Sequence, residues 1–177
     1  MRAGQKVSQL LIPQEEVQKA IKRLATEIRR DYKDKNPILV GVLKGSFVFL
    51  ADLVRQLDIP LEVEFVQLSS YGETTISSGK IKWVKGTTFS VKGRDVLVIE
   101  DIVDSGWTSS FLLNYLKKKK PASLRLCTLL KKSGCQQVFV QVDYVGFEIP
   151  NQFVMGYGLD WKGQFRYLPD ICFVETI

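Results

Sequence analysis

Residues 96–110 read Val-Leu-Val-Ile-Glu-Asp-Ile-Val-Asp-Ser-Gly-Trp-Thr-Ser-Ser. The apolar run that opens this stretch predicts a strand buried on both faces of a parallel sheet. Two adjacent acids follow the run, then a third acid and a Ser-Gly-x-Thr sequence that leads into a predicted helix. In open α/β sheets, ligands lie beyond the carboxyl ends of the strands, and a helix start offers free N–H groups to phosphate.

The three acids of this stretch are Glu100, Asp101 and Asp104. They repel phosphate unless they bind hydroxyl groups, a metal ion or a transferable proton. A helix start beside solvated acids would be the better interpretation of a lone Asp-Ser-Gly. The whole combination instead favours a site for a sugar phosphate.

On both sides of this stretch, strand patterns alternate with helical patterns, which predicts a mostly parallel sheet in a single α/β domain over residues 1–177. The stretch 69–92, rich in Gly, Ser and Thr, is longer than an ordinary connection and is expected to be a lid or a disordered loop. The expected helices cover 13 to about 36, 47–57 and 108–120. The expected strands cover 38–43, 61–68, 95–99 and 124–130, with strand-like runs at 138–142, 153–155 and 171–174.

Composition excludes several classes of chemistry. The chain has 177 residues and no histidine, so Ser-His-Asp catalysis, Cys-His catalysis and His-ligated metals are excluded. Its three scattered cysteines argue against a disulfide scaffold or a zinc site and predict a cytoplasmic protein. No apolar run is long enough to cross a membrane. A net charge of +6 predicts an anionic partner.

The stretch 96–110 resembles the phosphoribosyl pyrophosphate motif of type I phosphoribosyltransferases, and other blocks resemble the hypoxanthine-guanine phosphoribosyltransferase family. The resemblance implies that family's fold, a mostly parallel central sheet flanked by helices. It also implies a small hood formed by 145–177 with part of the N-terminus, and a mobile lid at 69–92. The other blocks are Gly41–Ser46 (pyrophosphate loop), Ser69–Gly72 (start of the lid), and 129–132, 145–150, 153–160 and 165–166 (base-binding region).

The family's activity is purine salvage by a pentosyltransferase. It moves the 5-phosphoribosyl group from phosphoribosyl pyrophosphate to a 6-oxopurine, and releases IMP or GMP and pyrophosphate. The resemblance implies Mg²⁺ as the cofactor, held by Glu100, Asp101 and Asp160. It makes Asp104 the catalytic acid/base residue. Binding of phosphoribosyl pyrophosphate would fall to Leu43, Lys44, Gly45, Glu100, Asp101, Asp104, Ser105, Gly106, Trp107, Thr108 and Arg166.

The purine, by the same resemblance, would be bound by Lys132, Phe153, Val154 and Asp160, and the lid would act through Ser70 and Tyr71. Lys131 competes with Lys132 for the 6-oxo oxygen of the purine, and neighbours along a strand point to opposite faces, so only one can serve. The spacing to Gly146 favours Lys132. Phe153 could equally be a core residue. Trp107 departs from the small, polar or basic residue expected in the phosphate loop, and its side chain needs an apolar neighbour.

A second hypothesis is an RNA-binding transcription attenuator built on the same fold, since the positive charge suits nucleic acid. The 6-oxopurine residues argue against it, so nucleic acid is not the expected partner. Another sugar-phosphate enzyme of doubly wound fold is a third, weaker hypothesis. The family implies a homodimer or homotetramer. The preference among hypoxanthine, guanine and xanthine stays open.

Overall fold

A computed structural model describes residues 8–70, 81–85 and 89–174 of the chain. In this part of the chain the main sheet has six strands in the order β4-β3-β2-β5-β6-β7. Neighbouring strands are parallel except β3 and β4, which are antiparallel. The mostly parallel sheet predicted from the sequence is therefore present. Its strands are β2 (Ile38–Leu43), β3 (Glu62–Ser70), β4 (Ile81–Lys85), β5 (Asp95–Val103), β6 (Ser123–Lys132) and β7 (Tyr144–Ile149).

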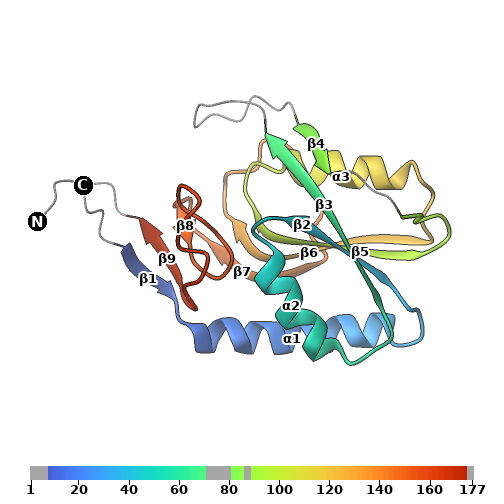
Figure 1. Cartoon of the computed structure of the whole chain (residues 1–177), viewed down its shortest axis with the longest axis horizontal. Helices are drawn as coiled ribbons and strands as arrows, with labels where there is room; N and C mark the ends of the chain where they lie inside the picture. Colours follow the sequence, from blue (N-terminus) through green and yellow to red (C-terminus); the bar gives the residue numbers. More distant parts are fainter. Residues whose placement is uncertain (1–7, 71–80, 86–88, 175–177) are drawn as a thin grey trace, which may run out of the picture.

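Helices cover both faces of this sheet (Figure 1). Helices α1 (Gln14–Tyr32) and α2 (Phe47–Leu57) pack on one face, and α3 (Trp107–Lys117) packs on the other. Successive residues of β2 show why, since Leu39 belongs to the core cluster with α1 and α2 whereas Val40 belongs to the cluster with α3. Both faces of the central strands are thus buried, which explains their continuous apolar runs.

A second, three-stranded sheet stands beside the main one and joins the two ends of the described chain (Figure 1). It consists of β1 (Ser8–Ile12), β9 (Ile171–Val174) and β8 (Val154–Met155), in that order and antiparallel. The expectation of a hood from both terminal segments agrees with this arrangement, although strand β7 belongs to the main sheet. The hood also touches α1, because Asp170 Oδ1 accepts the Gln14 N–H at 2.7 Å.

Three expectations about local structure were wrong. The segment 138–142 is irregular, because Gln137 and Val138 donate their N–H groups to Ser105 O instead of to a strand. The first helix ends at Tyr32, before the expected Asn36-Pro37. The stretch 69–92 is not one loop, since β3 runs to Ser70 and β4 lies within it. Trp83 of β4 packs on α3, with ring centroids 5.6 Å from Phe111 and 4.7 Å from Tyr115.

A polar cluster joins the end of α1 to β6 and β7. Arg125 donates to Asp31 at 2.7 Å and lies 2.6 Å from the Tyr144 hydroxyl, which itself donates to Asp31 at 2.7 Å. The Tyr144 hydroxyl, together with Arg30 and Arg125, lowers the pKa of Asp31 to about 2. This cluster lies at the far end of the sheet from the carboxyl ends of the strands, where β6 starts at Ser123.

None of the described helices is both long and apolar enough to span a lipid bilayer.

Candidate active site

The candidate site lies where the strand order reverses. From β2 the chain passes to β3 on one side and later returns to β5 on the other, so the carboxyl ends of β2 and β5 flank the crevice where open α/β sheets bind ligands. The loop after β2 contains a cis peptide bond between Leu43 and Lys44. A Cβ atom on Gly45 would lie 1.5 Å from Asp101 Oδ2, so only glycine lets this loop approach the end of β5 so closely.

The predicted phosphate loop follows β5 and ends at the start of α3. Gly106 takes φ +87° as the residue before the helix, and no side chain caps that helix end. A helix start of this kind presents free N–H groups and the positive end of the helix dipole to an anion. A Cβ on Gly106 would lie 2.3 Å from Val138 O, so the irregular segment 138–142 supports the loop from behind. Ser105 and Thr108 are both partly buried on this loop.

Trp107, the departure from the expected sequence, is the first residue of α3. Its indole Nε1 donates to Gln137 Oε1 at 3.0 Å. The side chain thus binds a polar partner, where the sequence suggested an apolar neighbour. Its backbone N–H remains at the helix start, where phosphate would bind.

The two adjacent acids differ in their surroundings. Glu100 is buried, its Oε2 accepts the Ser109 hydroxyl at 2.5 Å, and its Oε1 has no hydrogen-bond partner among the described residues. Burial raises the pKa of Glu100 to about 8. Burial also raises the pKa of Asp101 to about 6, although backbone N–H groups and Arg166 favour its charged form. Sequence reasoning missed Ser109, which carries no signal except its place in the first turn of α3.

The two candidate lysines point to different partners. Lys132 Nζ pairs with Asp104 Oδ2 at 2.7 Å, with 10% of the lysine side chain exposed. Lys131 Nζ instead pairs with Glu148 across strands β6 and β7 at 2.8 Å. The structure therefore brings Lys132 to the predicted acid/base residue and leaves Lys131 away from it.

Arg166 and Asp160 form an ion pair, with Arg166 Nη2 2.5 Å from Asp160 Oδ1. Arg166 Nη1 also donates to Gly158 O at 2.7 Å. Asp160 Oδ2 accepts the Gly163 N–H at 2.7 Å. Both oxygens of Asp160 thus have partners within its own segment, which the sequence did not suggest.

The remaining predicted purine residues lie at β8. Phe153 is 53% exposed, so it is not a core residue, and its ring is free to stack on a base. Val154 is buried in β8. Trp161 stacks on Phe165 with ring centroids 6.1 Å apart. Ser70 is the last residue of β3, and Tyr71 lies outside the described residues.

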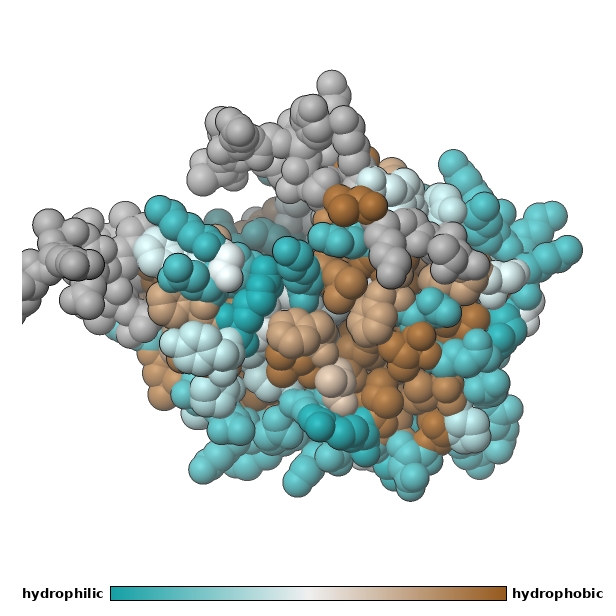
Figure 2. Space-filling model, viewed as in Figure 1, coloured by the Kyte–Doolittle hydropathy of each residue, from teal (hydrophilic) through white to brown (hydrophobic). Residues whose placement is uncertain are grey.

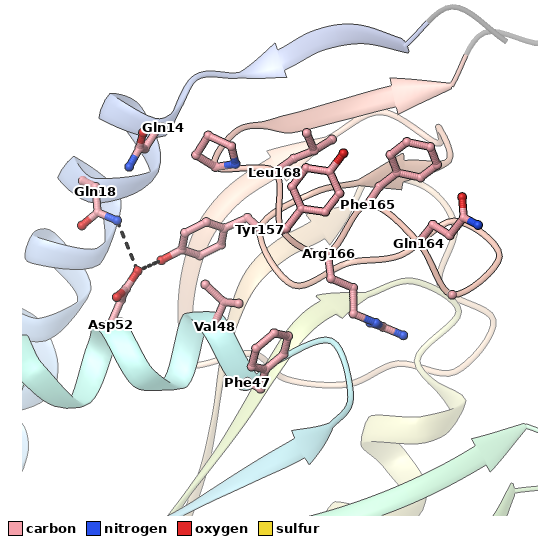
Figure 3. Close-up of a pocket in the computed structure, with 13 residues that line it drawn as sticks. Gln14, Gln18, Phe47, Val48, Asp52, Tyr157, Gln164, Phe165, Arg166 and Leu168 are labelled. Carbon is pink, nitrogen blue, oxygen red and sulfur yellow. Dashed lines mark hydrogen bonds between the residues drawn. The ribbon is translucent and has the colours of Figure 1, made fainter. Parts of the chain in front are cut away.

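A cavity with a volume of about 800 Å³ lies next to this site (Figure 3). Its walls come from α1, α2, Tyr157 and the segment 163–169. It shares Arg166 with the candidate site, but the strand ends and the phosphate loop do not line it. Figure 3 shows Asp52, Gln18 and Tyr157 joined by hydrogen bonds at one end of the cavity.

Comparison with known proteins agrees with this geometry. The model of the phosphoribosyl transferase domain family matches residues 8–162. The chain is 45% identical over 165 residues to the hypoxanthine-guanine phosphoribosyltransferase of Bacillus subtilis strain 168, covering 93% of this chain and 92% of that protein. This chain belongs to the hypoxanthine-guanine phosphoribosyltransferase family. The RNA-binding hypothesis is not favoured by these matches.

Two further matches bear on this family assignment. A crystal structure of a hypoxanthine-guanine phosphoribosyltransferase from Bacillus anthracis superposes with a TM-score of 0.91 at 40% identity, covering 96% of this chain and 100% of that one. The chain is also 47% identical over 165 residues to the bifunctional protein TilS/HprT of Listeria innocua. That match covers 93% of this chain but only 26% of the Listeria protein, so the chain spans about a quarter of that relative's length.

The acids at the end of β5 fit the magnesium ion that the family implies. Among the described residues Glu100 Oε1 has no hydrogen-bond partner, and the Asp101 carboxylate follows directly. Magnesium prefers oxygen ligands and usually binds one or two protein carboxylates together with substrate phosphates and water. In the ranges that the structure describes, no three His, Cys, Asp or Glu side chains are placed to hold a metal ion by themselves.

Proposed function

We propose that the chain is a hypoxanthine-guanine phosphoribosyltransferase that makes IMP and GMP from phosphoribosyl pyrophosphate and a 6-oxopurine. The observation that carries the proposal is the Lys132–Asp104 pair beside a helix start suited to phosphate. This arrangement provides a cation for the 6-oxo oxygen, an acid/base group for the ring nitrogen and a cradle for the 5′-phosphate.

The anionic ends of phosphoribosyl pyrophosphate bind at two loops in this proposal. The first N–H groups of α3, with the Ser105 and Thr108 hydroxyls, donate to the 5′-phosphate. The backbone of Lys44 and Gly45 and the Arg166 guanidinium donate to the pyrophosphate. Glu100 and Asp101 accept hydrogen bonds from the ribose hydroxyls. Glu100 and Asp101 would hold one magnesium ion and Asp160 would reach a second one. When bound, the metal would neutralise part of the charge on the departing pyrophosphate.

The purine is held against the sugar by Lys132, which donates to its 6-oxo oxygen, and by the exposed ring of Phe153. As the bond between C1′ and the pyrophosphate oxygen breaks, that oxygen keeps the electron pair. The purine ring nitrogen forms the new bond to C1′, and its proton passes to Asp104. In this proposal the lid that contains Tyr71 excludes water, which would otherwise react with the oxocarbenium-like sugar.

Exposed apolar surface supports the proposed association into a homodimer or homotetramer. Figure 2 shows hydrophobic surface over α2 and β3, and Phe47, Val63 and Phe65 there are 44%, 38% and 36% exposed. Contiguous apolar surface of this kind marks contact sites. The three free cysteines are consistent with the proposed cytoplasmic location.

A nucleotide-formation assay tests the proposed activity. Purified protein is incubated with magnesium, phosphoribosyl pyrophosphate and, separately, hypoxanthine, guanine, xanthine, adenine or uracil. We expect IMP and GMP, and the relative rates rank the accepted bases. If neither hypoxanthine nor guanine gives a nucleotide, the proposed activity is wrong.

A further inference from the structure

The turn Gly156-Tyr157-Gly158 packs between the loop that contains Gly45 and the segment that contains Asp170. All three residues have positive φ angles, +96°, +51° and +93°. A Cβ on Gly158 would lie 2.3 Å from Gly45 O, and a Cβ on Gly156 would lie 2.1 Å from Asp170 O. The turn therefore packs directly against the loop proposed to bind pyrophosphate, and any shift of the turn shifts the space beside that loop.

The same turn holds Arg166 from two directions. The Gly158 N–H donates to Arg166 O at 3.0 Å, and Arg166 Nη1 donates to Gly158 O at 2.7 Å. The Tyr157 N–H donates to Leu168 O at 2.8 Å. The positions of both proposed pyrophosphate-binding groups, the Gly45 backbone and the Arg166 guanidinium, thus depend on the position of residues 156–158.

The side chain of Tyr157 ties this turn to α2. Its hydroxyl donates to Asp52 Oδ2, which also accepts Gln18 Nε2 at 3.3 Å (Figure 3). Arg55 donates to the other oxygen of Asp52. Only 4% of Tyr157 is exposed. Burial and the nearby Asp52 carboxylate raise the pKa of Tyr157, which keeps the phenol protonated as a donor.

We infer that Tyr157, held by Asp52, is a positioning residue for the pyrophosphate end of the active site. The inference rests on the proposed function. Asp52 lies in the second turn of the helix that begins right after the pyrophosphate loop, so its bond to Tyr157 fixes the turn relative to that loop. Tyr157 does not touch substrate in this arrangement. It acts through Gly158, the Gly45 backbone and Arg166.

The test removes one oxygen and measures each substrate separately. In Tyr157→Phe the ring stays and only the donation to Asp52 is lost. We expect the KM for phosphoribosyl pyrophosphate and the Kd of magnesium pyrophosphate, measured by calorimetry, to rise roughly tenfold, equivalent to about 1.4 kcal/mol. The KM for hypoxanthine should stay unchanged. Because the calorimetric measurement needs no turnover, it reports positioning directly.

Tyr144→Phe is the matched control. It also removes a buried phenol that donates to a carboxylate, Asp31, but in the cluster at the far end of the sheet. Both variants should lose thermal stability, and only Tyr157→Phe should lose pyrophosphate affinity. If Tyr157→Phe does not fold, Asp52→Asn keeps the shape of the partner with a weaker acceptor, and it should show the same selective loss at smaller size.

The double variant Tyr157→Phe/Asp52→Ala completes the cycle. If the two residues act through one bond, Asp52→Ala should cost no further pyrophosphate affinity in the Tyr157→Phe background. If the wild type makes nucleotide but Tyr157→Phe and Tyr144→Phe bind magnesium pyrophosphate equally well, the inference is wrong and the proposed function stands. A wild type that makes no nucleotide overturns the proposed function and this inference with it.

Discussion

The Lys132 ammonium and the Asp104 carboxylate form an ion pair, with Nζ and Oδ2 2.7 Å apart. The lysine ends β6 and has only 10% of its side chain exposed, whereas the aspartate follows β5 and is about half exposed. In the protein without substrate, each group therefore provides the hydrogen-bond partner and the opposite charge for the other. A purine that binds Lys132 through its 6-oxo oxygen and Asp104 through its ring N–H would bridge the same two groups.

Replacement of Asp104 should separate chemistry from binding. An asparagine keeps the size of the side chain but does not accept the purine proton, so Asp104→Asn should lower single-turnover rates by roughly 10²- to 10⁴-fold. Binding of phosphoribosyl pyrophosphate, followed by calorimetry, should persist. Asp34→Asn, a change at an exposed carboxylate on the α1–β2 connection, serves as the control. Single-turnover rates close to wild type would assign the proton transfer to another group.

The adjacent lysines offer an internal comparison for the purine site. Lys132→Met should raise the KM for hypoxanthine at least roughly tenfold, since hydrogen bonds from charged donors contribute about 1.5–3 kcal/mol. Lys131→Met removes only the pair with Glu148, a partly exposed ion pair that contributes about 0–1 kcal/mol to stability. The KM of Lys131→Met for hypoxanthine should therefore match that of the wild type. The reverse result would place Lys131 at the purine.

Strong local patterns allowed several elements to be predicted from the sequence. Strand β2 and helix α2 have the predicted bounds, because a continuous apolar run ends at Lys44 and a helical pattern starts at Phe47. The buried start of β5 was equally clear. Strands β1 and β7 were not predicted, because β1 is five residues long and is stabilised by pairing with β9. In β7, Gly146 and Glu148 weaken the apolar pattern.

The sequence suggested the residues of the candidate site but not the contacts between them. The proposed phosphate loop and Asp104 lie in one continuous stretch, so local pattern was enough to suggest them. The approach of Gly45 to Asp101 brings a loop to the end of a strand more than fifty residues away, and it depends on β2 pairing with β5. The Asp160–Arg166 pair depends on the turns of the segment between them. Such contacts are set by tertiary structure, which no local pattern encodes.

The approach of Gly45 to Asp101 gives a further prediction. In Gly45→Ala the new methyl group would overlap the Asp101 carboxylate, so either the loop after β2 or the Asp101 side chain must move. A displacement of about 1 Å in an active site can cost roughly 10²-fold in rate, and we expect a loss of that order in kcat/KM for phosphoribosyl pyrophosphate. In Gly134→Ala the added Cβ meets nothing within 4 Å, so this control should lose only stability, because its φ is +72°. Equal activity in both variants would show that the close approach has no part in catalysis.

The cluster of Asp31, Arg125 and Tyr144 predicts how stability depends on pH. The pKa of Asp31 is lowered to about 2, chiefly by the Tyr144 hydroxyl, from an ordinary value of 3.8. An acid with a lowered pKa stabilises the folded state above the unfolded pKa, and this contribution is lost as pH falls through the folded value. The free energy of unfolding should thus fall between about pH 4 and pH 2.

Urea unfolding of wild type, Asp31→Asn and Asp34→Asn at pH 5, 4 and 3 separates this contribution from the general effect of acid. Asp31→Asn should be less stable than wild type at pH 5, because the amide carries no charge for Arg125. Its stability should change less between pH 5 and pH 3, since the group that gains a proton in the unfolded chain is gone. Asp34→Asn should follow wild type, because Asp34 is exposed and its nearest cation, Lys33, lies 3.9 Å away. Parallel curves for wild type and Asp31→Asn would mean that other carboxylates govern the acid transition.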